Sequence, residues 1–264
     1  MNNEIKRHGT KKGVLAIIPV VFAIAITLTV AAIMNKGQTP PLPGGQSTDL
    51  PPISSPVPVD GTPQQPPEGS YSSGLEITVN PDGTATVNGI GSCADRTVRI
   101  PHTSQSGAVI TSIADSAFAS VRGIDTVVMP DSVVSIGAYA FKGSSITRIT
   151  VGSSVLSIGS AAFADCLLLE AIEVDGANPL FASVNGVLFN REITVLHCYP
   201  AGRPDSSYTI PSTVTEIRTM ALHSCNALKK LKYDGNAKRW ASVYVAAGNT
   251  LIDNLKVETI TSDK

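Results

Sequence analysis

Hydrophobic residues recur at fixed positions in three stretches of the chain that share one short pattern. SIADSAFAS (112–120), SIGAYAFKG (135–143) and SIGSAAFAD (157–165) begin 23 and then 22 residues apart, each with isoleucine second and phenylalanine seventh. A weaker copy, EIRTMALHS, occupies 216–224. A period of about 20–29 residues is typical of leucine-rich repeats, in which stacked units bury an apolar face that one unit cannot bury alone.

The recurring apolar positions predict the core of a β-rich solenoid with short helical turns. Each repeat is expected to supply one short strand, in which alternate residues such as Val127 and Met129 point inward, and to insert one large side chain. The expected core residues are the isoleucine and the phenylalanine or leucine of each copy: Ile113, Phe118, Ile136, Phe141, Ile158, Phe163, Ile217 and Leu222.

Small residues inside the pattern predict where the backbone turns and where neighbouring coils approach. We expect Gly137 and Gly159 to form a backbone turn that a side chain would hinder. Ala140 is expected to leave room for the adjacent coil. Before the repeats, Asp82 and Gly83 lie between two β-rich runs, which is a hairpin signal.

The N-terminal part of the chain predicts export and anchoring. Residues 13–34 form an uncharged apolar run of 22 residues, and about 20 suffice to cross a bilayer. Four basic residues precede this run and one follows it closely, which favours a cytoplasmic N-terminus and an extracellular remainder. A cleaved signal peptide, with small residues at 30–32 as the cleavage site, is the alternative. Both interpretations export residues 35–264.

The next segment, residues 35–70, contains ten prolines in 36 residues. Such a composition predicts a disordered, extended stalk, with an ordinary linker as the alternative. The predicted organisation is a basic cytoplasmic tail (1–12), a transmembrane signal-anchor helix (13–34), the stalk (35–70), an N-terminal β cap and first coil (71–108), leucine-rich repeats (109–233) with a longer interrupting unit near 178–211, and a C-terminal cap and tail (234–264).

Several blocks of sequence, in order, are similar to one known family. GIGSCADRTVRIP, VVSIGAYAFKG, SITRITV, NPLFASVNGVLFN and YDGNAKRWASVYVAAGNTLIDN resemble the BspA-like leucine-rich repeat family of bacterial surface proteins. Ala114 and Arg218, where the family favours glycine, and Leu222, where it favours phenylalanine, depart from the pattern. The resemblance implies a right-handed solenoid at the surface of the bacterial plasma membrane and a role in adhesion or recognition.

Charge and reactive side chains narrow the possible functions. The 20 basic and 21 acidic residues nearly balance, so no overall positive field predicts nucleic-acid binding. The four cysteines form no CxxC pair, and Cys166 and Cys225 share one repeat position that suits a buried thiol. No histidine has the sequence context of a triad or a zinc site. We therefore expect no enzyme, catalytic residue, metal or cofactor; a hydrolase is a remote alternative.

The face opposite the inward strand residues is the predicted ligand face. Its candidate residues are Thr126, Val128, Arg148, Thr150, Glu173, Lys230 and Lys232, which form one strip along the solenoid. The alternative is a solvated face with scattered charges. Trp240 is expected to cap the end of the solenoid, or to be an exposed aromatic for stacking.

These features together predict a membrane-anchored cell-surface protein that recognises a protein or glycan ligand. A structural envelope spacer without a ligand is the alternative.

Overall fold

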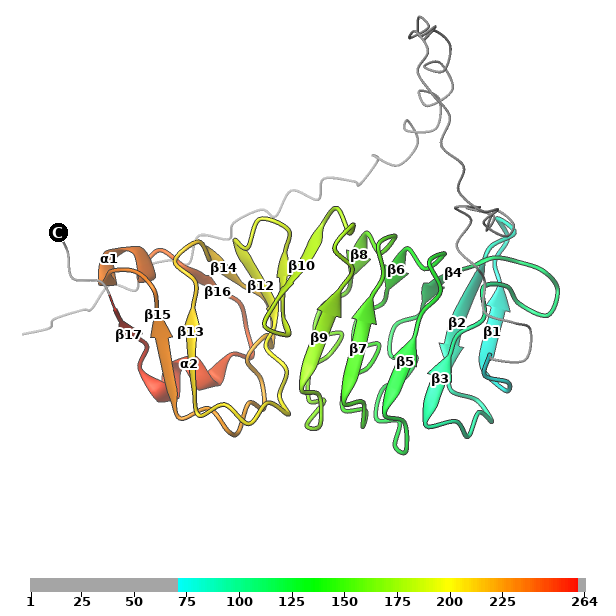
Figure 1. Cartoon of the computed structure of the whole chain (residues 1–264), viewed down its shortest axis with the longest axis horizontal. Helices are drawn as coiled ribbons and strands as arrows, with labels where there is room; N and C mark the ends of the chain where they lie inside the picture. Colours follow the sequence, from blue (N-terminus) through cyan, green and yellow to red (C-terminus); the bar gives the residue numbers. More distant parts are fainter. Residues whose placement is uncertain (1–70, 261–264) are drawn as a thin grey trace, which may run out of the picture. The chain divides into compact units, whose positions relative to one another are not determined.

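Pairs of short strands, one on each of two faces, repeat along the chain (Figure 1). The computed structural model describes residues 71–260. The strands form two blocks, each with two sheets. The first block contains β1 (Glu76–Val79), β2 (Ala85–Gly89), β3 (Thr97–Arg99), β4 (Ile110–Ile113), β5 (Thr126–Val128), β6 (Ser135–Ile136), β7 (Arg148–Val151), β8 (Ser157–Ile158) and β9 (Ala171–Val174). The second block contains β10 (Phe181–Val184), β11 (Val187–Asn190), β12 (Val195–Cys198), β13 (Ser207–Ile210), β14 (Glu216–Ile217), β15 (Lys230–Tyr233), α1 (Ala237–Trp240), β16 (Tyr244–Val245), α2 (Thr250–Leu255) and β17 (Glu258–Thr259).

Each coil of the solenoid is one strand pair. We number the coils 1 to 7 by the pairs β2/β3, β4/β5, β6/β7, β8/β9, β12/β13, β14/β15 and β16/β17. In the first block, one sheet has the order β1-β2-β4-β6-β8 and the other β3-β5-β7-β9. In the second block, the orders are β10-β11-β12-β14-β16 and β13-β15-β17. The chain is thus a β-rich leucine-rich repeat solenoid with two short helices among its described residues.

The expectation of one strand per repeat is wrong, because each regular coil has two. The Ser-Ile pair that opens the repeated pattern is itself a strand, and Ile113, Ile136 and Ile158 lie in register in neighbouring parallel strands. These strands have only two ladder residues in coils 3 and 4, so the sequence shows no alternation from which they could be recognised. The predicted hairpin around Asp82 and Gly83 is confirmed as the connection from β1 to β2.

A turn segment follows the Ser-Ile strand in coils 2, 3, 4 and 6, at residues 114–120, 137–143, 159–165 and 218–224. Hydrogen bonds join successive turn segments: the N–H of Tyr139 donates to the carbonyl of Ser160, and that of Phe141 to the carbonyl of Ala162. The residues at the third and seventh positions of each segment, such as Tyr139, have positive φ; they are Ser116, Ser120, Tyr139, Gly143, Ala161, Asp165, Met220 and Ser224.

The prediction that Gly137 and Gly159 are needed for a backbone turn is wrong. Their backbone has no positive φ. Instead, a Cβ atom on Gly159 would lie 2.3 Å from the backbone nitrogen of Ala138, and one on Gly137 would lie 2.4 Å from that of Asp115. Glycine is therefore required because adjacent coils approach too closely for any side chain.

The interior contains a row of aromatic rings. Phe118 and Phe141 stack with centroids 5.2 Å apart, and Phe141 and Phe163 with centroids 5.6 Å apart. Phe141 and Ala140 are fully buried, whereas Ile158, next to the gap described below, is only partly buried. The remaining expected core residues are buried: Ile113, Phe118, Ile136, Phe163, Ile217 and Leu222.

The β10–β11 hairpin separates two hydrophobic cores. Residues of β11 alternate between them: Leu188 belongs to the core of the first block, and Val187 and Phe189 belong to that of the second. All three side chains are almost completely buried, since neighbouring residues of a strand point to opposite faces. The hairpin is thus an internal wall that both blocks share.

Candidate functional site

The outward-facing side chains of β3, β5, β7 and β9, all exposed except the partly buried Thr126, form one surface, which we call the first strip. It comprises Thr97, Arg99, Thr126, Val128, Arg148, Thr150 and Glu173. Thr97 pairs with Thr126, and Thr126 pairs with Arg148, in successive parallel strands. Thr150 pairs with Glu173 in the same way. The strands are held by backbone ladders, so the side chains project from a rigid support.

The structure divides the predicted strip in two. The turn of the β10–β11 hairpin lies against the edge of β9: the N–H of Ile172 donates to the carbonyl of Gly186 at 2.9 Å, and the Ser183 hydroxyl donates to the carbonyl of Ile172 at 2.7 Å. Ala171, two residues before Glu173 on the same strand, is buried under this turn. Glu173 remains exposed and ends the first strip.

A second strip lies on β13, β15 and β17. It comprises Ser207, Thr209, Lys230, Lys232 and Glu258. Lys230 is exposed and Lys232 is partly buried. The Lys230 ammonium lies 3.2 Å from a Glu258 carboxylate oxygen, and both side chains are about half exposed. The predicted basic end is therefore partly neutralised by an acidic residue that follows in the last coil.

The first strip also carries more basic residues than its predicted part suggested. Arg99 lies on β3, beside Val128 in the register of the sheet. The Arg148 guanidinium lies 3.9 Å from the Glu170 carboxylate, and both side chains are mostly exposed. At such exposure the pair constrains Arg148 little, because solvent screens the attraction. Arg99, Arg148 and Glu173 therefore project from the strip as charges accessible to a partner.

Sequence reasoning missed Thr97, Arg99, Ser207, Thr209 and Glu258. Strands β3, β13 and β17 belong to coils whose sequences lack the repeated nine-residue pattern, so their register could not be aligned from the isoleucine and phenylalanine positions. The alternation of β-branched and polar residues in TVRIP (97–101) and SYTIP (207–211), with proline directly after, is the signal from which they could be found.

Trp240 ends the short helix α1 and packs against the second core. Its ring centroid lies 5.3 Å from that of Tyr233, and the indole is partly buried. Tyr233 is fully buried and its hydroxyl donates to the carbonyl of Ser212 at 3.1 Å. Asn236 caps α1 by accepting from the N–H of Arg239. The indole thus covers part of coil 6 next to the last coil.

The buried cysteines have the properties of structural thiols. Cys93, Cys166, Cys198 and Cys225 are unpaired. The Cys166 thiol donates to the carbonyl of Phe141 at 2.9 Å. Burial raises the pKa of Cys166, raises that of Cys225 to about 12, and holds that of Cys198 well above its usual value. These three buried thiols are therefore protonated at neutral pH, whereas the thiolate is the reactive form.

Within residues 71–260, no group of three or more histidine, cysteine or acidic side chains could hold a metal ion. Nor does any helix there have the length and apolar character needed to span a membrane. The predicted anchor at 13–34 and the predicted stalk at 35–70 lie outside the described residues.

Comparison with solved structures finds bacterial repeat proteins. A leucine-rich cell-surface protein from Faecalibacterium prausnitzii A2-165 is 18% identical, with 61% of this chain and 69% of that chain covered and a TM-score of 0.38. A leucine-rich repeat protein from Eubacterium ventriosum ATCC 27560 is 24% identical, with 62% and 61% covered and a TM-score of 0.36. The pneumococcal vaccine antigen PcpA is 17% identical, with 62% and 64% covered and a TM-score of 0.33.

No curated protein is significantly similar to the chain in sequence. A family description does match: six copies of the BspA-type leucine-rich repeat region cover residues 98–189 and 204–260. The first matched range runs from β3 to β11 and the second from just before β13 to β17, so the match leaves out β1, β2 and β12. The chain therefore belongs to the BspA-type leucine-rich repeat family.

Proposed function

We propose that this chain is a non-enzymatic recognition protein of the bacterial cell surface, and that its first strip binds a protein ligand. The observation that carries the proposal is the first strip itself. Seven side chains of mixed polarity stand on four paired strands, and three of them are charged. A surface whose backbone is already ordered binds at a low cost in conformational entropy.

The proposed location rests on the N-terminal sequence. The apolar run at 13–34 is long enough to serve as a single-pass anchor with a cytoplasmic N-terminus, and the proline-rich segment 35–70 would hold the solenoid away from the membrane. Adhesion to a host or envelope component is the role that such an arrangement favours. We also propose that Trp240 caps the C-terminal end of the solenoid.

A binding screen with the full chain tests this function. The immobilised protein is titrated with host matrix proteins and, in parallel, with envelope glycans. We expect saturable binding of a protein. Glu173→Lys in the first strip should change its affinity at least about fivefold, because charges in an interface set both encounter and register. Glu192→Lys makes the same charge change in the exposed turn between β11 and β12, outside both strips, and should have no effect.

Different outcomes of the screen separate the alternatives. Binding that Lys230→Glu alters and Glu173→Lys does not would move the site to the second strip. Saturable binding of a glycan alone would replace the protein ligand. Absence of any saturable ligand across the screen would favour the structural spacer.

A further inference from the structure

The hydrogen-bond ladder that joins turn segments is interrupted after coil 4. The third and fifth residues of each turn segment donate to the next one: Ser116 and Phe118 to segment 137–143, and Tyr139 and Phe141 to segment 159–165. The equivalent donors in coil 4 are the N–H groups of Ala161 and Phe163. Among residues 71–260, neither group has a hydrogen-bond acceptor.

The interruption follows from the sequence of coil 5. Its strand β12 is followed by Tyr199-Pro200-Ala201-Gly202, which crosses directly toward β13 and forms no turn segment. The N–H of Tyr199 donates to the carbonyl of Ala221, and the N–H of Gly202 donates to the carbonyl of Leu169. Coil 5 therefore contacts both neighbours but leaves empty the place where a turn segment would lie between 159–165 and 218–224.

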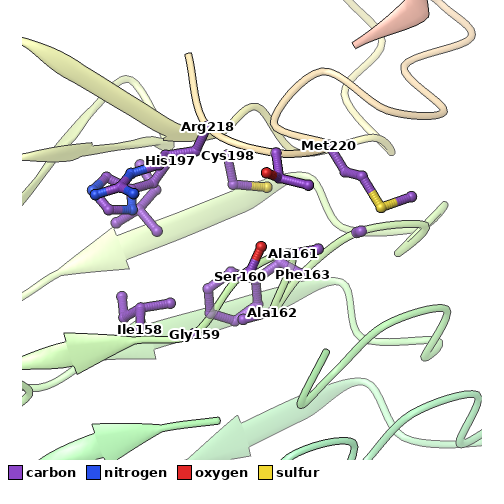
Figure 2. A pocket seen from close by; sticks show the side chains of 13 residues that line it. Ile158, Gly159, Ser160, Ala161, Ala162, Phe163, His197, Cys198, Arg218 and Met220 are labelled. Atoms are coloured by element: carbon purple, nitrogen blue, oxygen red, sulfur yellow. The ribbon is translucent and has the colours of Figure 1, made fainter. Parts of the chain in front are cut away.

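A pocket occupies that place. Its cavity volume is about 150 Å³, and it opens to solvent. One wall is the turn segment of coil 4, including Ser160, Ala161 and Phe163, and the other includes Arg218, Thr219 and Met220 of coil 6, with His197 and Cys198 of β12 between them. Figure 2 shows Ser160 and Ala161 on one side of the pocket and Arg218 and Met220 on the other. We call this pocket the slot.

Backbone groups on both walls suit a peptide. In regular coils, the carbonyl at the second position of a turn segment accepts from the preceding coil, as that of Ser160 accepts from Tyr139. The equivalent carbonyl in coil 6 is that of Thr219, which has no donor among residues 71–260. The slot thus presents two donors, Ala161 and Phe163, on one wall and an acceptor on the other. Phe163 is buried and Ala161 and Thr219 are partly buried, so a ligand that pairs their backbone groups would complete the interrupted ladder.

Side-chain contacts join the same two segments at one end of the slot and fix the distance between its walls. The Ser224 hydroxyl donates to Asp165 Oδ1 at 2.6 Å, and His223 Nε2 lies 3.2 Å from the same oxygen. His223 Nδ1 also lies 3.1 Å from the carbonyl of Gly248 in coil 7. These contacts bridge coils 4 and 6 directly, so the slot does not depend on a ligand to hold it open.

We propose that the slot binds a short segment of another protein, rich in glycine, alanine and serine, that takes the place of the missing turn segment. Its alternate carbonyls accept from Ala161 and Phe163. Its side chains must be small at the first and fourth positions, where neighbouring turn segments approach closely: Gly159 has no room for a Cβ atom, and Ala140 and Ala162 are buried. This site shares no residue with the first strip and goes beyond the proposed function.

Site-resolved amide hydrogen exchange of the full chain is the first test. Tyr139 and Phe141 are internal controls, because their N–H groups occupy the same positions one coil earlier and are bonded. Without ligand, we expect Ala161 and Phe163 to exchange at least about tenfold faster than these controls. Equal protection of all four amides in the ligand-free chain would mean that residues of the chain itself fill the slot, and would overturn the proposal.

Addition of a peptide is the second test. The probe is the acetylated and amidated nonapeptide SIGSAAFAD, which copies residues 157–165 and can present carbonyls as that segment does in coil 4. Saturable binding should slow exchange at Ala161 and Phe163 and leave Tyr139 and Phe141 unchanged. A peptide with leucine in place of its two adjacent alanines should bind at least about tenfold more weakly, since the second of them copies Ala162, which is buried in coil 4.

Paired variants locate the binding site. Ser160→Tyr places a ring at the mouth of the slot, because Ser160 is exposed, and should weaken peptide binding at least about tenfold. Ser106→Tyr makes the same change in the exposed loop between β3 and β4, outside both strips, and should leave peptide binding unaltered. No saturable binding of the probe, or binding that Ser160→Tyr leaves intact, overturns the slot. Neither result bears on the protein ligand of the first strip, which Glu173→Lys tests separately.

Discussion

Coils 2 to 4 and coil 5 connect a strand on one face to a strand on the other in different ways. The regular coils use the isoleucine strand and a turn segment that is hydrogen-bonded to the turn segment of a neighbouring coil. Coil 5 uses a hairpin before its strand and a direct crossing after it. The regular connection repeats its contacts at every step, whereas the connection in coil 5 ends one ladder and starts another. Periodic packing therefore gives uniform support, and its interruption creates both an internal wall and a slot.

Coil 5 is held by polar side chains where the regular coils are held by backbone and phenylalanine contacts. Arg203 Nε donates to Asp205 Oδ2 at 2.7 Å, and the Tyr199 hydroxyl donates to the same oxygen at 3.1 Å. The Arg203 guanidinium also donates to the carbonyl of Asn185 in the hairpin turn. The hydrogen bond from Arg203 lowers the pKa of Asp205, and burial raises that of Tyr199. This group ties the wall to coil 5.

The largest expected effect concerns the regular coils. Phe141→Ala removes the middle ring of the stack and leaves a cavity, and should lower the free energy of unfolding by about 3–5 kcal/mol in urea denaturation. Phe141→Leu keeps most of the buried volume and should cost less than about 1.5 kcal/mol. A similar loss for the two variants would show that stacking, and not volume, determines the stability of this core.

A smaller effect is expected at the boundary of the two blocks. Burial, with a contribution from Arg218, lowers the pKa of His197 to about 4, and its ring packs edge-on against Phe181. Between the usual histidine pKa of about 6.5 and pH 4, the unfolded chain binds a proton that the folded chain does not. Stability should therefore decrease by about 2–3 kcal/mol as the pH falls through this range.

Urea denaturation at several pH values measures this dependence. His197→Phe should remove the decrease between pH 6.5 and 4, because the substituted side chain cannot bind a proton. His102→Phe, in the loop before β4, should keep it. A decrease that persists in His197→Phe would assign the pH dependence to other groups.

The smallest expected effect compares one repeat position in the two blocks. Gly159→Ala forces a Cβ atom against the backbone of coil 3 and should destabilise the fold by about 1–3 kcal/mol. Arg218 has the same position in coil 6, but it lines the slot and is exposed. Arg218→Ala should therefore change the free energy of unfolding, measured by thermal denaturation, by no more than about 0.5 kcal/mol. Equal costs at the two positions would contradict the absence of a turn segment in coil 5.

The regular part of the fold was predictable because its sequence repeats. Isoleucine and phenylalanine at fixed spacing indicate which side chains face inward, and stacking then follows from the need to bury them. The purpose of Gly159 was not predictable from this pattern. Glycine is typical both of positive φ and of close backbone contact, and only the distance to Ala138 distinguishes the two.

The candidate surface was predictable only within the regular coils. The alternation in β5 and β7 places Val128, Arg148 and Thr150 outward, as the structure has them. The division of the strip was not predictable, because it depends on a hairpin turn that reaches β9 from a distant part of the chain. The slot was missed for a related reason: it results from a segment that coil 5 lacks, and no residue marks such an absence.

The shared wall has a consequence for how the length of this molecule can vary. Neighbouring regular coils make the same contacts, so one unit of 22 or 23 residues can be added or removed between β4 and β8 without changing the interfaces that remain. Each such change would alter the span of the first strip by one strand spacing, about 4.8 Å. The hairpin fits one specific coil on each side and cannot be duplicated in this way. The number of regular coils can thus vary, whereas the β10–β11 hairpin and its two neighbouring coils are fixed.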